Sequence, residues 1–549
     1  MRQIPASAWG LAILSGALQV LIFPSPGLYW LCWVALAPLI VAILGLYRPR
    51  NTELLDVAGR EVRPGAAAGF LLGYSSGVIW YAGSCYWIYH VMHVYGGVGA
   101  AASAGIVVLF CLYLGLYHGL FGWLLARAAR RGKHGIRRAL LLAPFLWVAV
   151  ELARARITGF PWDLLGTAQV NNLPLTRIAT FTGVYGISFE IALINAAFAA
   201  AFVIPLRARG AMLGSALAAA LLLQAGALVA LRPAPRDRVA TLVQSDIPIL
   251  EPGEWTAEYF DRTIVELVRL SLPAAKTNQE AQSGPGLIVW PETPAPFYDT
   301  DPRFRDAVSG LARRANAYVL VGSVGVRTMT QHGQQGAAGG NPVPVSSTRV
   351  LNSAALVGPN GEWVARYDKV HLVPFGEYVP FRPLFAFAEK LTKEVGDFSR
   401  GSERRVLDLG GRKVGAFICY ESVFPDEVRQ FTKNGARLLV NISNDGWFGE
   451  SGAPGQHLNM ARMRAIENQR WLLRDTNTGI TASIDPYGRV VARAPRGERL
   501  TLQAPYALIS EVTFYTAHGD WFAWTCAIIA LAGLLVRARF KSQVIWSKN

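Results

Sequence analysis

The chain has 549 residues, which is enough for two or more domains. Hydrophobic residues make up 52% of it and charged residues only 16%, a balance that excludes an ordinary soluble protein. The net charge of +16 is concentrated in a few short connections, and this distribution argues against a nucleic-acid-binding surface.

Eight apolar runs are candidates for membrane-spanning helices, because a bilayer core of about 30 Å needs about 20 helical residues. They lie at Ala8–Phe23, Leu28–Leu46, Ala66–Val91, Val98–Ala126, Ala139–Ala153, Ala179–Leu206, Ala211–Leu231 and Trp521–Val536. The first run lacks an A-x-A cleavage site and is followed at once by the second, so we expect a retained helix. Seven spans then precede a long polar segment, and one follows it.

The connections between these runs alternate in charge. The N-terminus, the second, fourth and sixth connections and the C-terminal tail together hold 17 Lys and Arg residues against three acidic ones. Short loops rich in Lys and Arg stay in the cytoplasm. We therefore expect both termini to be cytoplasmic, with Lys133 and Lys541 inside, and the polar segment to lie on the outer side of the membrane.

The polar segment predicts an α/β layered domain. Short β-branched runs at 239–244, 287–290, 318–324, 414–418 and 437–442 alternate with helical patterns. The helical patterns cover Ala257–Leu272, Arg303–Ala315 and Asn459–Leu473. Residues 352–357 and 364–367, joined by Gly-Pro-Asn-Gly, predict a hairpin. We thus expect a membrane domain at 1–231, a catalytic domain at 232–515, and an eighth span with a basic tail at 516–549.

Chemically useful residues follow three of the predicted strands, where open α/β sheets gather their reacting groups. They are Glu292, Cys419 and the run 441–449. Cys419 is the one cysteine of the polar segment, so an intradomain disulfide is excluded and an inert or a reactive thiol remains. A reactive thiol needs a base, which Glu292 can supply, and a cation for the oxyanion, which Lys369 can supply.

Three motifs resemble the active-site motifs of the nitrilase, or carbon–nitrogen hydrolase, superfamily. They are Trp-Pro-Glu-Thr at 290–293, Tyr-Asp-Lys-Val-His-Leu-Val-Pro-Phe-Gly-Glu-Tyr-Val-Pro at 367–380, and Ile-Cys-Tyr-Glu at 418–421. The resemblance implies an αββα sandwich with a Glu292–Lys369–Cys419 triad.

The whole layout is also similar to the apolipoprotein N-acyltransferase family, as is the wording of the motif at 371–380 and of Asn-Asp-Gly-Trp-Phe-Gly at 444–449. This second resemblance implies further site residues that support the reaction or contact the substrate. They are Glu377, Tyr420, Glu421, Trp255 and Trp447. The stretch 329–347 is an insertion relative to this family and has no assigned role.

The family resemblance implies a ping-pong N-acyltransferase with no cofactor and no metal. Its acyl donor is a membrane phospholipid, its acceptor is the amino-terminal diacylglyceryl-cysteine of an apolipoprotein, and its intermediate is a Cys419 thioester. We expect a monomer.

Several alternatives stay open at this point. The enzyme could be a membrane-bound amidase in which water accepts the acyl group, or the chain could be a transporter with an inert outward domain. Glu377 could act only by fixing Lys369, and Trp255 could be a core aromatic. His371 has no necessary role, and Glu151 and Glu190, near or inside apolar runs, are functional candidates without an assignment.

Overall fold

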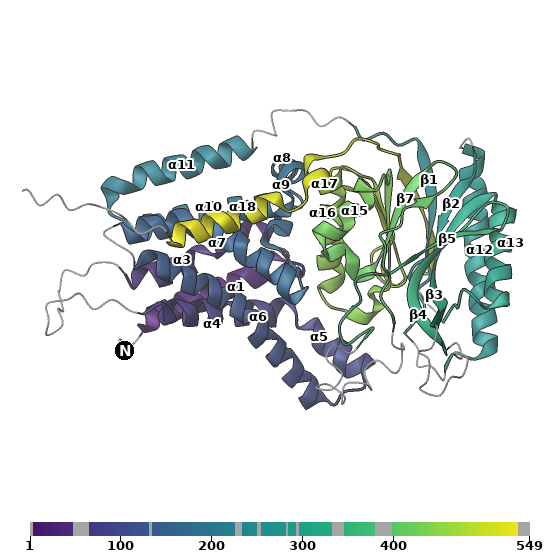
Figure 1. Ribbon diagram of the computed structural model, residues 1–549, viewed down its shortest axis with the longest axis horizontal. Coiled ribbons are helices and arrows are strands. Elements are labelled where there is room, and N and C mark those ends of the chain that lie inside the picture. Colours follow the sequence, from purple (N-terminus) through teal and green to yellow (C-terminus); the bar gives the residue numbers. More distant parts are fainter. Residues whose placement is uncertain are drawn as a thin grey trace, which may run out of the picture.

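The computed structural model describes residues 4–47, 65–130, 134–224, 233–249, 254–281, 284–292, 296–331, 345–378 and 398–535. A helical module and an α/β module lie side by side (Figure 1). The final helix returns from the α/β module to pack among the helices of the first part of the chain.

Helices occupy all eight apolar runs. The module consists of α1 (Ala6–Ile22), η1 (Tyr29–Leu31), α2 (Cys32–Ala35), α3 (Ala37–Gly45), α4 (Ala66–Ser84), α5 (Trp87–His90), η2 (Val91–Tyr95), α6 (Ala100–Ala129), α7 (Gly135–Ala153), η3 (Arg154–Thr158), η4 (Leu165–Gln169), α8 (Leu173–Thr176), α9 (Ala179–Thr182), α10 (Val184–Val203), α11 (Leu206–Gln224), α17 (Phe514–His518) and α18 (Trp521–Leu535). Within the described part of the chain, two of these helices, α6 and α10, are long and apolar enough to cross a membrane.

The second apolar run is broken between α2 and α3, and a buried side-chain amide forms hydrogen bonds with the backbone groups at this break. The Asn195 Oδ1 accepts the backbone N–H groups of Leu36 and Ala37, at 2.8 and 2.9 Å. Its Nδ2 donates to the carbonyl of Cys32 at 2.8 Å. In an apolar interior these backbone groups have no water to replace a lost partner. Asn195 of α10 thus allows the chain to bend inside the helical module.

The α/β module is an αββα sandwich, as the sequence predicts. One sheet has the order β12 (Leu500–Tyr506), β1 (Arg238–Gln244), β2 (Gly286–Val289), β3 (Ala317–Gln331), β4 (Val345–Val357) and β5 (Trp363–Asp368). The other has the order β11 (Val490–Arg493), β10 (Ala482–Ile484), β9 (Leu472–Thr476), β8 (Leu438–Ser443), β7 (Lys413–Ile418) and β6 (Leu407–Asp408). The outer helices are α12 (Ala257–Ala281) and α13 (Pro302–Ala315) on the first sheet, and α15 (Pro425–Lys433) and α16 (Ala453–Asn468) on the second.

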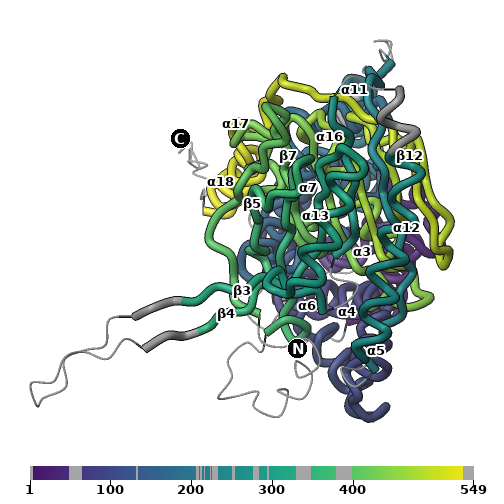
Figure 2. The backbone as a smooth tube through the Cα atoms, turned by 90° about the vertical axis from the view of Figure 1, so that its right-hand side faces the viewer, coloured from purple at the N-terminus to yellow at the C-terminus, as the bar shows by residue number. Residues whose placement is uncertain are grey.

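The predicted hairpin forms between β4 and β5, which are antiparallel. In the preceding hairpin, β3 and β4 make a long paired ribbon that projects from the domain (Figure 2). Most of the insertion at 329–347 lies outside the described residues, as do Lys133, Lys541 and the end of the seventh apolar run.

The predicted helix Asn459–Leu473 is wrong at its C-terminal end. Helix α16 begins earlier, at Ala453, and ends at Asn468, where Gln469 adopts a left-handed conformation with φ of 49°. Residues 472–476 then form β9, parallel to β8. A helix cannot continue through a left-handed residue, and an apolar run this short suits either a helix or a buried strand.

The two modules share buried hydrogen bonds, so α16 is packed between the second sheet and the helices (Figure 1). The Gln456 Nε2 donates to the carbonyls of Pro24 and Ser84, at 2.6 and 3.3 Å. At the other end of α16, the Glu467 Oε1 accepts the backbone N–H of Val184 at 2.9 Å. These contacts hold the second sheet against the helical module.

Replacing Asn195 by Ala should destabilise the helical module. The substitution leaves two buried backbone N–H groups without an acceptor, and each unsatisfied group lowers the free energy of unfolding by about 1–3 kcal/mol. We expect a melting temperature several degrees lower for the detergent-solubilised protein. Asn459→Ala is the matched control, because that amide bonds only the part-buried Arg462. Equal melting temperatures for the two variants would contradict the role of Asn195.

Candidate active site

Four strand ends meet at one edge of the paired sheets. Glu292 lies just past β2, Lys369 directly follows β5, Cys419 directly follows β7, and Asn444 directly follows β8. The parallel strands β7 and β8 carry the second and the third of the predicted functional segments, and β2 carries the first. The strand-end pattern predicts this edge for Glu292, Cys419 and the segment after β8, and Lys369 lies at the same edge, next to Glu292.

Two buried carboxylates share two donors at this edge. The Lys369 Nζ lies 3.1 Å from the Glu292 Oε1 and 3.0 Å from the Glu377 Oε1. The Asn352 Nδ2 donates to the same two oxygens, at 2.8 and 2.7 Å. The second oxygen of each carboxylate accepts a backbone N–H, from Asn444 for Glu292 and from Val373 for Glu377. The cluster is 7% exposed or less at Glu292, Glu377, Lys369 and Asn352.

This arrangement keeps the Lys369 side chain protonated. Burial alone would lower its pKa, but the carboxylates of Glu292 and Glu377 raise the pKa of Lys369 well above its ordinary value. The ammonium is therefore a positive charge that acts on the neighbouring Cys419 thiol. A charge of this kind can stabilise an oxyanion without any rearrangement during the reaction.

Cys419 is held as a neutral thiol. Burial raises its pKa, and the negative charge of Glu292 raises it further, whereas Lys369 and a hydrogen bond with Ser443 lower it. A thiol whose pKa is raised needs a base before it can act as a nucleophile, and the Glu292 carboxylate lies close enough to affect the pKa of Cys419. Cys419 has a positive φ of 49°, a conformation rare for a residue with a side chain. Strain of this type is typical of functional positions.

Glu421 braces the active site from behind the nucleophile. Its Oε1 accepts the Tyr367 hydroxyl at 2.7 Å and the backbone N–H of Val370 at 2.8 Å, and its Oε2 accepts the N–H of Ile418 at 2.8 Å. It thus ties the segment that carries Lys369 to the strand that carries Cys419. Burial raises the pKa of Glu421, which these hydrogen bonds partly offset.

Tyr420 faces the helical module. Its hydroxyl donates to the carbonyl of Gly159 at 2.8 Å, and its ring lies against Phe160 and Phe424. Trp447 lies nearby in the segment after β8, half-buried, with its ring against Tyr95 of η2 at 5.3 Å. Both residues therefore lie where the helical module meets the segments that follow β7 and β8.

Trp255 is placed differently from the other predicted residues. Its ring packs on Tyr259 of α12 at 5.0 Å and against the hydrophobic cluster of the first sheet. None of its described contacts reaches the triad. A role for Trp255 at the substrate remains a prediction.

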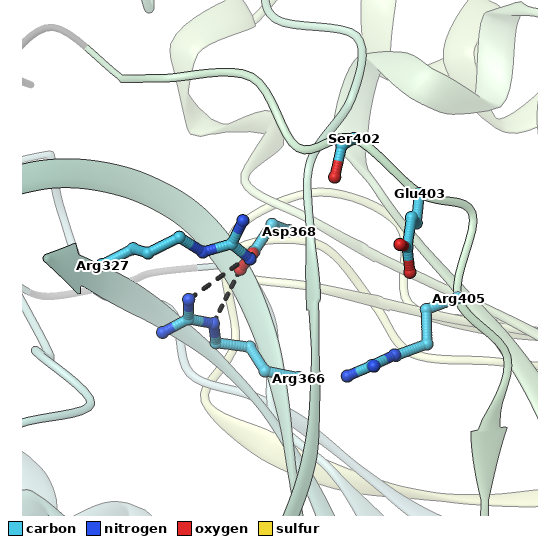
Figure 3. Close-up of a pocket in the computed structure, with 6 residues that line it drawn as sticks. All are labelled: Arg327, Arg366, Asp368, Ser402, Glu403 and Arg405. Carbon is cyan, nitrogen blue, oxygen red and sulfur yellow. Dashed lines mark hydrogen bonds and ion pairs between the residues drawn. The ribbon is translucent and has the colours of Figure 1, made fainter. Parts of the chain in front are cut away.

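Asp368, next to Lys369, is fixed from the outer side of the sheet. Arg327 and Arg366 both donate to its carboxylate, each at 2.7 Å, at a surface pocket (Figure 3). The other side of this pocket is lined by Ser402, Glu403 and Arg405. The pocket contains none of the candidate catalytic residues, and its ion pairs anchor the end of β5.

Sequence reasoning missed Asn352 and the polar groups behind Cys419. Asn352 lies inside a strand of the hairpin, 60 residues from Glu292 in the chain, and no local pattern marks it. His457 and Arg474 are fully buried and contact the nucleophile's loop or its neighbours. A run of polar residues in an otherwise apolar strand, Arg474 to Thr476, is the one signal that could have indicated them.

The remaining candidates stay without a catalytic assignment. The Glu151 Oε1 accepts the N–H of Leu165 at 2.7 Å, beside a cavity lined by Arg154 and several aromatic rings, and Glu190 is buried in α10. His371 packs on Phe424. Within the described residues, no group of three or more His, Cys, Asp or Glu side chains could hold a metal ion.

Comparison with known proteins gives the chain's relatives. Residues 239–510 match the carbon-nitrogen hydrolase family, and residues 15–197 match the apolipoprotein N-acyltransferase N-terminal domain. The apolipoprotein N-acyltransferase of Geobacter metallireducens is 36% identical, over 99% of this chain and 97% of that protein. That of Methylococcus capsulatus is 34% identical, over 87% and 88%.

The chain belongs to the apolipoprotein N-acyltransferase family. It is therefore an N-acyltransferase, as the motifs indicate, built on a carbon–nitrogen hydrolase fold. Among solved structures, an amidase from Nesterenkonia sp. is 20% identical with a TM-score of 0.35, covering 52% of this chain and 95% of the amidase. Saccharomyces cerevisiae Nit3, a nitrilase superfamily member, is 18% identical with a TM-score of 0.35, covering 53% and 97%.

Replacing Asn352 by Asp should abolish most of the acyltransferase activity. The substitution removes the shared donor and places a third carboxylate beside Glu292 and Glu377, so that Glu292 binds a proton more tightly and loses its function as a base. We expect a loss of about 10²–10⁴-fold in turnover, the usual contribution of a general base.

Asn434→Asp is the matched control for this experiment. Its amide makes one exposed hydrogen bond, to the Arg404 carbonyl, and the variant should turn over like the unmodified enzyme. Comparable turnover in the Asn352 and Asn434 variants would show that the shared donor is dispensable.

Proposed function

We propose that this protein is a multi-pass enzyme of the bacterial inner membrane that completes lipoprotein maturation. It transfers a fatty acyl chain from a membrane phospholipid to the α-amino group of the diacylglyceryl-cysteine at the amino terminus of an apolipoprotein. The names of its relatives support the acceptor, and the composition of residues 1–231 supports the membrane location. We expect a monomer that acts without cofactor.

The observation that carries this proposal is the direction in which the nucleophile's loop points. Cys419 is 8% exposed, and the next residue, Tyr420, bonds Gly159 of the helical module. Aromatic rings from both modules surround this contact. They belong to Trp87, Phe160, Trp162, Tyr420 and Phe448. An apolar surrounding of this kind suits an acyl chain that arrives from a bilayer.

The first half of the reaction loads the enzyme. Glu292 takes the thiol proton of Cys419, and the thiolate attacks an ester carbonyl of the phospholipid. The Lys369 ammonium stabilises the tetrahedral oxyanion. The carbon–oxygen bond then breaks, Glu292 returns the proton to the departing glycerol oxygen, and lysophospholipid leaves behind a thioester on Cys419.

The second half transfers the acyl group to nitrogen. The acceptor's amine, as the free base, attacks the thioester carbonyl, and the carbon–sulfur bond breaks as the amide forms. Glu292 takes a proton from the attacking nitrogen and returns it to Cys419. The same triad thus serves both halves, which is the basis of ping-pong kinetics.

The need for a membrane module follows from the donor. Withdrawing an acyl chain of about 16 carbons into water costs about 0.8 kcal/mol for each CH₂ group. The site therefore has to open toward the bilayer. We propose that residues 1–231 and 516–549 provide this environment and that residues 232–515 are the catalytic domain on its periplasmic side.

The persistence of the thioester separates this function from that of an amidase. Water must be a poor acceptor, or the enzyme would degrade membrane lipid. Incubation with phospholipid alone should add the mass of one fatty acyl group, labile to hydroxylamine and mapped to Cys419. A peptide with a free amino-terminal diacylglyceryl-cysteine should discharge it, and acetylation of that amine should prevent discharge.

Cysteine variants control this experiment. Cys419→Ala should form no adduct, and Cys419→Ser should be nearly inactive, because the pKa of an alcohol lies far above that of a thiol. Cys32, Cys85, Cys111 and Cys526 lie in or at the end of helices of the helical module, and their Ala variants should load normally. Rapid release of free fatty acid, with no adduct at Cys419, would instead identify a hydrolase.

Topology can be tested on intact spheroplasts with a membrane-impermeant amine label. The exposed Lys413 and Lys433 of the catalytic domain should react, whereas Lys133 and Lys541 should be spared until the membrane is opened. Labelling of Lys541 in sealed spheroplasts would reverse the proposed orientation.

A further inference from the structure

A buried histidine contacts the backbone of the nucleophile from behind. His457, in the first turns of α16, is 0% exposed, and its Nε2 lies 3.1 Å from the carbonyl oxygen of Cys419. The same Nε2 lies 2.7 Å from the Ser422 hydroxyl. Because a carbonyl oxygen can only accept, the contact with Cys419 requires a hydrogen on Nε2.

The opposite ring nitrogen is held by a charged pair. The His457 Nδ1 lies 3.0 Å from the Asp445 Oδ1 and 3.0 Å from a terminal nitrogen of Arg474. Arg474 also pairs with the Asp445 Oδ2 at 2.7 Å, and the Ser443 hydroxyl donates to the Asp445 Oδ1 at 2.7 Å. Asp445, His457 and Arg474 are all 0% exposed.

These contacts select one tautomer of His457. Burial and the Arg474 charge lower the pKa of His457, which favours the neutral ring. With its hydrogen on Nε2, the ring donates to Cys419 and Ser422, and its Nδ1 accepts from Arg474. With its hydrogen on Nδ1, the ring would donate to Asp445 and accept from Ser422, but the Cys419 carbonyl would face a second acceptor; Arg474 would lose its contact with the ring and keep its pair with Asp445. The first arrangement is the one that the Cys419 contact requires. It places two acceptors, Nδ1 and the Asp445 Oδ1, side by side, and the hydrogens that Arg474 and Ser443 donate to this pair compensate for their repulsion.

The conformation of Cys419 explains why this donor is needed. A φ of 49° is unfavourable for a residue with a side chain, and it persists only where neighbouring groups enforce it. Cys419 does not continue the extended conformation of β7, so its carbonyl oxygen lies outside the hydrogen-bond ladder of that strand. His457 gives that carbonyl a partner inside the protein.

The same turn of α16 is fixed to the helical module. Gln456, adjacent to His457, accepts the Trp162 indole N–H at 2.7 Å and donates to the carbonyl of Pro24 at 2.6 Å. The Trp162 ring stacks on the His457 ring, with centroids 5.7 Å apart and planes 25° apart. The donor to the nucleophile is therefore positioned by both modules.

We propose that His457 is a positioning residue, whose Nε2–H holds the Cys419 backbone in the conformation that presents the thiol to Glu292 and Lys369. Asp445 and Arg474 orient its ring, and the helical module fixes its distance. This role rests on the proposed function, in which Cys419 is the nucleophile. A misplacement of about 1 Å in a reacting group can cost on the order of 10²-fold in rate.

Two amide substitutions test the role of Nε2 directly. In His457→Gln the side-chain nitrogen reaches the place of Nε2, whereas in His457→Asn it reaches only that of Nδ1. The rate of thioester formation at saturating phospholipid should be at least about tenfold higher in the Gln variant, the worth of about one hydrogen bond. His457→Phe should load about 100-fold more slowly than the unmodified enzyme.

The phospholipid concentration at half-saturation separates positioning from general damage. It should stay within about twofold in all three variants, because only the nucleophile's geometry changes. His518→Phe is the matched control, since His518 is exposed and stacks on Phe514 outside the network. It should load like the unmodified enzyme. Melting temperatures show which variants remain folded. Because the Gln and Asn variants both carry a polar amide, a difference in their loading rates reflects the position of the amide nitrogen.

The outcomes separate the two proposals. Equal loading rates in the Gln and Asn variants, or an unchanged rate in the Phe variant, would overturn the role of His457 while Cys419→Ala still forms no adduct. An adduct in Cys419→Ala would instead overturn the nucleophile itself.

Discussion

The active site depends on holding two carboxylates side by side without water. Glu292 and Glu377 would repel each other strongly in a buried site if each stood alone. One ammonium, from Lys369, and one amide, from Asn352, each contact both of them. A single positive charge is thus shared between two negative ones. Other contacts keep these four groups together. Glu421 ties the segment that carries Lys369 to the end of β7. The ion pairs of Arg327 and Arg366 with Asp368 anchor the end of β5, which precedes Lys369.

Behind the nucleophile lies a second buried network, of opposite purpose. The first network holds the proposed catalytic charges, whereas Asp445, Arg474 and His457 form a second group whose contact with Cys419 is through its backbone. A buried network of this kind resists movement, because a charged group that moves away from its partners stays desolvated without compensation. The nucleophile therefore sits between one network that acts on its thiol and another that fixes its main chain.

Much of the fold and part of the site could be predicted from sequence. Strand ends mark where Glu292 and Cys419 must lie, because parallel strands present their carboxyl ends at one edge. Helices fill the apolar runs, the alternation of strand and helix predicts an α/β layered domain, and the αββα sandwich is what the resemblance to the nitrilase superfamily implies. Asn352 could not be predicted, since its partners lie 60 and 25 residues away and an isolated amide in a strand has no local signature. The predicted C-terminal end of α16 was wrong. The helix ends where Gln469 adopts a left-handed conformation, and no glycine marks that position in the sequence.

The docking of α16 bears on how the protein could be divided. Gln456 and Glu467, at its two ends, use their side chains to satisfy backbone groups of the helical module. A fragment cut near residue 232 would expose these amides and carboxylates, together with the Tyr420 ring, on the face that carries the nucleophile. Such a fragment would retain every residue of the triad and lose the surface against which the triad is assembled. The boundary between the modules is clear in the sequence, but it does not separate two domains that fold independently.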